Sequence, residues 1–563
     1  MTRFRNLMSS VAFGVLVAAL PATSALASGL AGSYLAARQA SSDNQFRLAV
    51  QYYTRALTQD RNNPLLMESL IVSYMGVGDV DKAVTVSRQM EAAKADSQIA
   101  QLILLGDAIR NGGDATAYSD SVGELVSGLV LAWDMLSQGN MSEALEKFDA
   151  LIATPGLKEF GAYHKALALG MAGDMEGADT ILSGEAEGPL RMTRRGVLAH
   201  AAILSQLDRG DDAIELIRSA LPDTTDPEIL ENLSELEAGR ALPFDMVKTA
   251  RDGQAEVFYT VAAALRGETP DSLTLLYSRL AEYLQPDHID ALLLSAGLLE
   301  SLGQTALATE AYDRVPSDNP AYHVAAIGRA DTLYETGKPD AAVEVLQQLG
   351  KTHPNITSVH VTLGDMLRRL SRYAEAEQAY SKAIALIEKP TASQWVVFYA
   401  RGITRERQDE WTPAEADFRK ALELRPDQPL VLNYLGYSLV EQDKNLDEAL
   451  TMIEAAVAER PNDGYITDSL GWVLYRLGRY EEAVPHMERA VELMPLDPII
   501  NDHLGDVLWR VGREREAEFQ WKRALSFKPE EPEQQRIRRK LDVGLDMVLS
   551  EEAKTPVDVA NDG

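Results

Sequence analysis

Tyrosine, tryptophan, arginine and aspartate side chains recur in the last third of the chain at spacings that fit one face of a helix. Tyr465, Trp472 and Arg476 are separated by seven and four residues, which places them on the same side of a helix. Asp506 and Arg510 repeat the last interval 34 residues further on. Tryptophan, tyrosine and arginine contribute most of the binding energy at protein interfaces. These residues therefore suit recognition of another protein or peptide.

Residue patterns that support catalysis are missing from the sequence. The 563 residues include no cysteine, which excludes disulfides, thiolate catalysis and cysteine-ligated zinc. Eight histidines are present, but no HExxH metal motif, phosphate-binding P-loop or G-x-S-x-G nucleophile motif accompanies them. We therefore predict a protein that is not an enzyme and that has no catalytic residues, metal ligands or cofactor.

The chain is strongly acidic, with 85 acidic and 54 basic side chains and a formal net charge of −31. Nucleic-acid binding draws on clustered lysine and arginine that neutralise phosphates, so we expect no nucleic-acid partner. One basic cluster stands out against this background: Arg536, Arg538, Arg539 and Lys540. It is typical either of a solvated helix face or of a docking site for an acidic partner or lipid headgroups.

The first 27 residues have the layout of a secretory signal peptide. Arg3 and Arg5 precede ten residues without a polar side chain, 11–20, and a small-x-small tripeptide ends at Ala27. Ten helical residues span about 15 Å of the roughly 30 Å of bilayer hydrocarbon. We therefore expect cleavage after Ala27 and export to the periplasm, with an uncleaved membrane anchor as the alternative. Ser28 stands where a lipoprotein has cysteine, so no lipid anchor is expected, and other membrane association stays open.

Small residues and prolines recur with a period of 34 or 35 residues between 395 and 531. The residues that mark the period are Gly402, Gly436, Gly471 and Gly505, then Ala449, Ala483 and Ala517, then Pro426, Pro461, Pro495 and Pro529. Glycine and alanine let two helices approach closely, while proline ends one helix and fits the first turn of the next. The pattern resembles the tetratricopeptide repeat, in which each unit is a pair of helices.

This resemblance implies an all-α fold, a right-handed superhelical solenoid of antiparallel helix pairs. The repeats match well over 255–531 and in a degenerate form over 28–254. We expect a helix over 532–550 to cap the open end of the solenoid, and 551–563 to form a disordered acidic tail.

The first helix of each tetratricopeptide repeat lines the concave side, and repeat positions 2, 5, 9, 12 and 13 face inward. The candidate partner-binding residues at these positions are Tyr399, Asn433, Tyr437, Tyr465, Asp468, Trp472, Tyr475, Arg476, Asp502, Asp506, Trp509 and Arg510. An alternative is open for them. The tryptophans could pack between neighbouring first helices, and the polar residues could form ion pairs inside the solenoid.

Two stretches of the last repeats, 463–478 and 501–512, support a closer resemblance. They are similar to the C-terminal part of an outer-membrane lipoprotein adaptor that partners a carboxyl-terminal processing protease in Gram-negative bacteria. The similarity covers about 395–531. It implies that the partners are an envelope protease and its substrates, which include cell-wall hydrolases. That adaptor is anchored through a lipidated cysteine, which this chain lacks.

These observations leave two main hypotheses for the function. The first is a non-enzymatic scaffold or adaptor in the bacterial cell envelope that delivers substrates to a periplasmic protease. The alternative is a structural assembly factor for outer-membrane or polysaccharide-export machinery. A third hypothesis, an enzyme within the irregular span 98–254, has no motif in its favour.

Overall fold

The computed structural model describes residues 30–186, 188–222 and 224–553, and these residues form α-helices α1 to α31 and one short 3-10 helix. No strand occurs among them, which confirms the all-α prediction. The expected signal peptide and residues 554–563 of the expected tail lie outside this part of the chain. Within it, no helix combines the length and the apolar character needed to cross a membrane.

The helices group into two compact units, one ending at Val345 and one beginning at Leu346. This division falls within α19 (Pro339–Thr352). It therefore lies inside the array that the sequence predicts from residue 255 onward. We describe each unit by itself.

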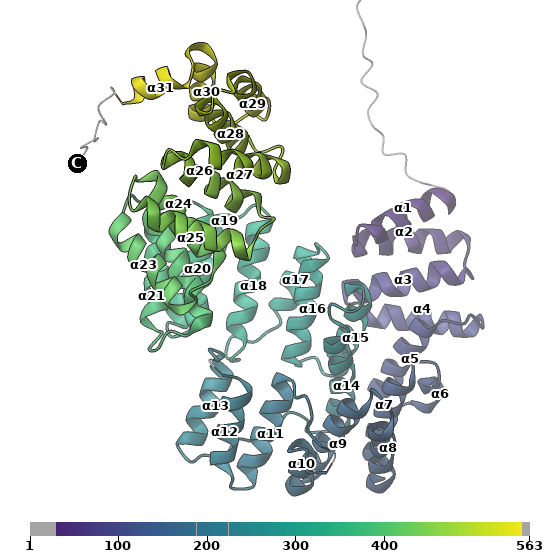
Figure 1. Ribbon diagram of the computed structural model, residues 1–563. Coiled ribbons are helices and arrows are strands. Elements are labelled where there is room, and N and C mark those ends of the chain that lie inside the picture. The colour runs from purple at the N-terminus through teal and green to yellow at the C-terminus, as the bar shows by residue number, and fades with distance from the viewer. Residues whose placement is uncertain (1–29, 187, 223, 554–563) are drawn as a thin grey trace, which may run out of the picture. The chain divides into compact units, whose positions relative to one another are not determined.

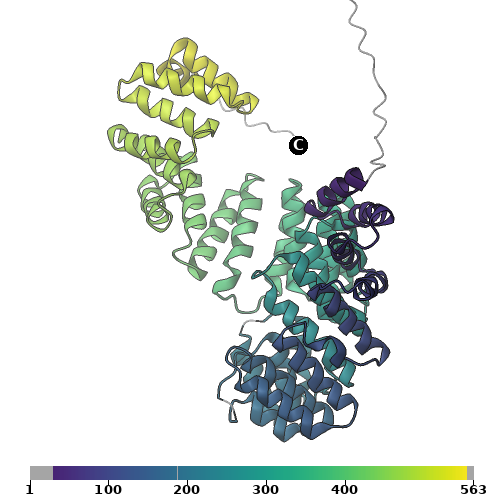
Figure 2. The same ribbon diagram turned by 90° about the vertical axis from the view of Figure 1, so that its right-hand side faces the viewer.

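The C-terminal unit is a succession of antiparallel helix hairpins (Figures 1 and 2). The hairpins are α20–α21 (Thr357–Arg369, Tyr373–Ala385), α22–α23 (Trp395–Glu406, Trp411–Leu424), α24–α25 (Pro429–Glu441, Leu446–Glu459), α26–α27 (Gly464–Arg476, Tyr480–Leu493) and α28–α29 (Pro498–Arg510, Glu514–Ser526). The 3-10 turn Ala392–Gln394 precedes α22. The first helices of neighbouring hairpins also touch, α24 against α26 and α26 against α28.

Local residue chemistry sets the ends of these helices. Asp463 and Asp497 accept hydrogen bonds from the first backbone N–H groups of α26 and α28. Pro498 occupies the first turn of α28, where no backbone donor is needed. Gly478 follows α26 with φ +75°, a left-handed conformation that glycine adopts without strain. The hairpins are therefore specified by short sequence signals at their turns.

Close helix approach explains the periodic glycines. A β-carbon on Gly471 would lie 2.7 Å from the Met487 side chain, and one on Gly402 would lie 2.6 Å from Phe418. The large side chain of the second helix thus packs directly onto the backbone of the first. This arrangement matches the physical reason that the sequence suggests for glycine at this repeat position.

Two helices follow the last hairpin, where the sequence predicts a single one. They are α30 (Glu531–Val543) and α31 (Leu545–Glu552), separated by Gly544 with φ +83°. A β-carbon on Gly544 would also come within 2.7 Å of the Trp509 ring. The chain can bend here because only glycine satisfies both the backbone angle and the close approach.

The N-terminal unit has a less sequential arrangement. Its helices are α1 (Leu30–Ser42), α2 (Phe46–Gln59), α3 (Pro64–Val77), α4 (Val80–Ala92), α5 (Gln98–Asn111), α6 (Thr116–Ser119), α7 (Glu124–Ser137), α8 (Met141–Ala153), α9 (Lys158–Ala172), α10 (Met175–Leu182), α11 (Arg194–Gln206), α12 (Gly210–Ala220), α13 (Pro227–Glu237), α14 (Ala250–Leu265), α15 (Asp271–Leu284), α16 (Ile289–Ser301), α17 (Thr305–Tyr312) and α18 (Tyr322–Glu335). The hairpin α14–α15 packs back on much earlier helices, α14 against α7 and α9, and α15 against α3 and α5 (Figure 1).

Buried contacts hold this returning hairpin in place. A β-carbon on Gly253 of α14 would overlap the indole ring of Trp133 on α7, which is fully buried. The Tyr283 hydroxyl on α15 donates to Asp81 at 3.0 Å and to Asp107 at 3.3 Å, residues 202 and 176 positions earlier. The N-terminal unit therefore depends on contacts between segments that are distant in sequence.

Candidate functional site

The predicted partner-binding residues all lie in the C-terminal unit, on α22, α24, α26 and α28. Trp472 is largely buried, because its indole stacks between Tyr475 and His503 with ring centroids 4.7 Å and 4.0 Å away. Its Nε1 donates to Glu441 Oε1 at 2.8 Å. Trp472 therefore contributes mainly to the packing between first helices, as the alternative interpretation describes.

A buried ion pair lies next to this aromatic stack. His503 Nδ1 is 2.9 Å from Asp468 Oδ2, and both side chains are almost entirely buried. Burial alone would lower the pKa of His503, but the Asp468 carboxylate outweighs that effect and the pKa is raised. The same kind of environment acts on Tyr475, whose pKa is raised to about 12 by burial and by Asp506. Sequence reasoning did not include His503 among the candidates.

The inner side of α28 is covered by the two C-terminal helices. Lys540 of α30 is fully buried, and its Nζ lies 2.7 Å from Asp502 Oδ2 and 2.6 Å from Asp506 Oδ1. Trp521 Nε1 also donates to Asp506 Oδ1 at 2.9 Å. Burial and the adjacent Asp506 carboxylate raise the pKa of Asp502. The interpretation of Lys540 as part of a solvated face is therefore wrong, since its charge is buried against this carboxylate pair. Arg536 adds a second positive charge there, with Nη1 at 3.8 Å from Asp502 and 3.5 Å from Asp506.

The other two predicted residues of α28 contact α31. Trp509 Nε1 donates to Asp546 Oδ2 at 3.1 Å, and Arg510 Nη1 donates to Asp546 Oδ1 at 2.8 Å. Arg536 and Arg539 of the basic cluster pair with Glu552 and Glu551 at the end of α31. The last repeat thus binds the C-terminal helices of its own chain.

The remaining predicted residues keep exposed surface. Tyr465 is 55% exposed, and Tyr399, Asn433, Tyr437 and Arg476 are partly exposed. Arg476 reaches Asp443 at 3.0 Å, and Asn433 Oδ1 is buried without a hydrogen-bond partner among the described residues. Burial raises the pKa of Tyr437, and the Glu441 and Asp468 carboxylates add to the rise.

Sequence reasoning missed three apolar residues on the same helices. Val396, Leu430 and Ile499 occupy repeat position 2, the position of Tyr465, and are 46%, 39% and 38% exposed. We call these four side chains the position-2 ridge. Their spacing of 34 or 35 residues is readable in the sequence, but a search restricted to polar and aromatic types passes over aliphatic residues. Exposed apolar side chains that align on successive elements are a common feature of protein-binding surfaces.

The N-terminal unit contains a pocket of about 660 Å³ between α9, α11 and α14, which sequence reasoning also missed. Below it, Arg195 pairs with Glu256 at 2.9 Å and 2.7 Å, and with Asp290. Tyr163 donates to Glu256 at 2.9 Å, and His288 Nε2 lies 3.1 Å from the same carboxylate. Arg195 together with His288 holds the pKa of Glu256 well below its usual range, although burial opposes this shift.

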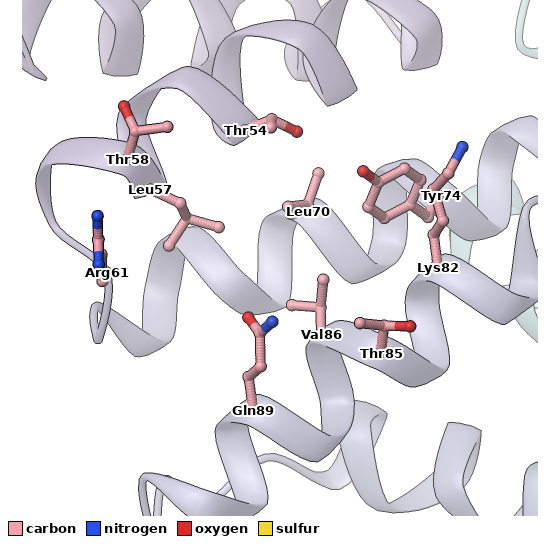
Figure 3. Close-up of a pocket in the computed structure, with 10 residues that line it drawn as sticks. All are labelled: Thr54, Leu57, Thr58, Arg61, Leu70, Tyr74, Lys82, Thr85, Val86 and Gln89. Carbon is pink, nitrogen blue, oxygen red and sulfur yellow. The ribbon is translucent and has the colours of Figure 1, made fainter.

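A second cleft in this unit, about 400 Å³, lies between α2, α3 and α4 (Figure 3). Leu57, Leu70 and Val86 form its apolar part, one from each helix. Two of its polar groups have local partners, since Lys82 binds Asp79 at 2.5 Å and the Thr85 hydroxyl donates to a carbonyl of its own helix. No cluster of three potential metal ligands occurs among residues 30–186, 188–222 and 224–553.

Comparison with known proteins agrees with the helix-pair architecture. Family models of the tetratricopeptide repeat match residues 327–393, 399–464 and 468–497. A TPR repeat-containing protein of Pseudomonas aeruginosa is 27% identical over 193 residues, which is 34% of this chain and 32% of that protein. The match thus spans about a third of the length of this curated relative. The chain carries tetratricopeptide repeats, and such repeats generally act as protein-interaction scaffolds.

Several solved structures are similar to this chain, but their TM-scores are low. The Cut9–Hcn1 hetero-tetramer of the APC/C is 14% identical, with 91% of this chain and 96% of that chain covered and a TM-score of 0.38. YrrB, a TPR protein with an unusual peptide-binding site, is 18% identical over 33% of this chain and 94% of that chain, with a TM-score of 0.29. MamA is 20% identical over 30% and 94%, with a TM-score of 0.27. These TM-scores are too low to support any inference about function.

Proposed function

We propose that the protein is a non-enzymatic scaffold that binds partner proteins along the first helices of its C-terminal repeats. The observation that carries this proposal is the position-2 ridge. Val396, Leu430, Tyr465 and Ile499 stand exposed at the same position of four successive hairpins. Partly exposed polar groups flank the ridge, including Arg476 and Asn433. A row of apolar anchors with polar neighbours matches the composition of protein interfaces.

We further propose that the scaffold works in the bacterial cell envelope, where it brings substrates to a periplasmic protease. Arg3, Arg5 and the apolar run 11–20 support export. The resemblance of 463–478 and 501–512 to a protease adaptor supports the kind of partner. The cell-wall hydrolases that such a protease degrades are the expected substrates.

The test is affinity purification from an envelope extract with the chain from Ser28 as bait. The wild-type bait should enrich a processing protease and cell-wall hydrolases, identified by mass spectrometry. A Leu430→Ala, Tyr465→Ala bait should lose them, because both side chains are exposed and their removal deletes ridge surface without opening a cavity. Both baits should have the same helical circular dichroism.

The matched control is Phe519→Ala. Phe519 lies on α29, the second helix of its hairpin, and is 63% exposed. This control bait should retain every partner. Enrichment of outer-membrane assembly proteins alone would favour the assembly-factor hypothesis. Partners that survive loss of the ridge side chains would refute binding at this face.

A further inference from the structure

We propose that the pocket between α9, α11 and α14 binds an aromatic side chain of a partner peptide. This side chain carries an N–H donor, and the tryptophan indole is its prototype. This inference rests on the proposed protein-binding function. It assigns a second and separate recognition site, located in the N-terminal unit.

The size and walls of the pocket suit an aromatic group. Its volume of about 660 Å³ lies within the range of small-ligand pockets, which extends from roughly 300 to 1,000 Å³. Phe160, Leu190, Met192 and Ala264 supply apolar surface. Tyr259 adds a ring whose centroid lies 4.9 Å from that of His288, with the two planes tilted by 37°, and 5.2 Å from the Arg195 guanidinium. Aromatic walls of this kind favour a flat, polarisable guest.

One end of the pocket presents unused hydrogen-bonding groups. Asp290 Oδ2 pairs with Arg195, whereas its Oδ1 has no hydrogen-bond partner among the residues that the structure describes. The Tyr259 hydroxyl, which also lines the pocket, has none there either. Asp290 keeps some exposure, so its free oxygen can accept a hydrogen bond from an incoming group.

The partners of the two carboxylates beneath the pocket favour a donor over an acceptor. Glu256 accepts two hydrogen bonds from Arg195 and one from Tyr163, and His288 Nε2 lies 3.1 Å from it. Among the described residues, Asp290 is paired through Oδ2 alone, with Arg195. Asp290 is also the carboxylate that lines the pocket, so its other oxygen is placed to accept a hydrogen bond there.

The cations at the rim of the pocket do not offset the acceptor character of Asp290. Arg194 is held by Asp226 at 2.7 Å and by Glu228 at 2.5 Å, so it presents no free charge to a ligand. Arg191 is exposed on the loop before α11, and Glu159, also exposed, lines the same pocket. An indole N–H, or another polarised N–H on an aromatic group, complements this end of the pocket.

The experiment is a titration of the chain from Ser28 with two probes, monitored by ¹⁹F NMR. The probes are N-acetyl-5-fluorotryptophanamide, whose side chain has an N–H donor, and N-acetyl-4-fluorophenylalaninamide, whose side chain has none. We expect saturable binding of both probes, with the tryptophan probe bound about tenfold more tightly because it alone hydrogen-bonds a charged acceptor. Asp290→Leu should remove this preference and leave the affinity for the phenylalanine probe within about twofold. Equal affinities for the two probes in the wild-type chain would overturn the assigned donor.

A filling substitution locates the site. Ala264→Trp places a large ring in the pocket from an exposed position of α14 and should abolish binding of both probes. Ala153→Trp, at an exposed position of α8, is the matched control and should bind like the wild type. Binding that persists in Ala264→Trp, or no saturable binding in the wild type, would overturn the pocket proposal. Because the probes require no partner protein, either result is independent of the position-2 ridge experiment.

Discussion

In both compact units glycine allows two helices to pack closely, but the helices in contact are separated by very different distances in sequence. In the C-terminal unit, the glycine of each first helix meets a side chain of the very next helix, as Gly471 meets Met487. In the N-terminal unit, Gly253 of α14 meets Trp133 of α7, and Gly106 of α5 meets Leu280 of α15. Glycine therefore permits close helix approach in both units. Only in the C-terminal unit does its spacing reveal which helix is the neighbour.

This difference implies different cooperativity. A repeat array is stabilised by each unit and its nearest neighbours, so damage to one repeat can remain local. In the N-terminal unit, the returning hairpin packs against helices from early in the chain. A substitution that weakens this contact should therefore destabilise all of these segments. Three predictions test this comparison, and each sets one unit against the other.

The largest expected effect is at the carboxylate pair under α30. Lys540→Met would remove the closer of the two cations that face the buried Asp502 and Asp506, leaving Arg536 Nη1 at 3.8 Å and 3.5 Å, and should destabilise the C-terminal unit by about 3–5 kcal/mol. Urea unfolding of the full chain should show an earlier transition for this unit and an unchanged one for the N-terminal unit. The matched control is Lys522→Met on α29, whose ion pair with Glu518 is exposed and should contribute less than about 1 kcal/mol. Equal stability of the two variants would contradict the assigned role of Lys540.

The next prediction compares one added methyl group in each unit. Gly253→Ala should cost about 3 kcal/mol, because the new β-carbon overlaps a buried indole that cannot move. Gly471→Ala should cost about 1 kcal/mol, since the flexible Met487 side chain can shift. Hydrogen exchange measures both effects. Loss of protection should extend from α3 to α15 in the first variant and stay near α26 and α27 in the second. Local loss of protection in both variants would remove the distinction between the units.

The smallest expected effect concerns the pH dependence of stability, which should have opposite signs in the two units. Burial lowers the pKa of His164 to about 4 in the N-terminal unit, where the ring accepts a hydrogen bond from Trp133 Nε1. The unfolded chain protonates this histidine below about pH 6.5. The N-terminal unit should therefore lose about 2 kcal/mol as pH falls from 6.5 to 5. His164→Gln should lack this loss in unfolding experiments across that range.

His503 in the C-terminal unit should respond in the other direction. Its pKa is raised above the unfolded value, so its pairing with Asp468 stabilises the fold fully below about pH 6.5. That contribution disappears as pH rises through the folded pKa. His503→Gln should flatten the stability profile on the alkaline side only. A wild-type C-terminal unit that gains stability over that rise would contradict the sign.

Much of the C-terminal unit could be read from the sequence because its determinants are local. The period of 34 or 35 residues inferred from residue 395 onward matches the spacing of the first residues of α22, α24, α26 and α28, which are 395, 429, 464 and 498. Capping aspartates, prolines and turn glycines act over a few residues, so their meaning is contained in a short window. The same windows carry no information about which distant segment covers a helix. This is why the return of α14 and α15 onto earlier helices was not foreseen.

The candidate site was foreseen only in part, for a related physical reason. Repeat position selects the residues that point away from the second helix, and this rule located Tyr465 and Arg476 on the accessible face. Repeat position does not show whether another helix covers that face. Asp506 and Trp509 were therefore predicted together with Tyr465 and Arg476, although α30 and α31 cover them. The sequence pattern around Lys540 is that of a charged surface helix. Its burial depends on two aspartates more than 30 residues earlier.

The returning hairpin also bears on how the chain is made. Trp133 and its neighbours on α7 are synthesised well before Gly253, the residue that covers them. At roughly 5–20 residues per second, the intervening 120 or so residues take on the order of 6–24 seconds to appear. During that interval the apolar surface of α3, α5 and α7 that α14 and α15 bury is still uncovered. Exposed apolar surface of this kind makes a nascent chain prone to aggregation, a risk that is smaller for the repeats of the C-terminal unit, whose helices pack against their neighbours in sequence.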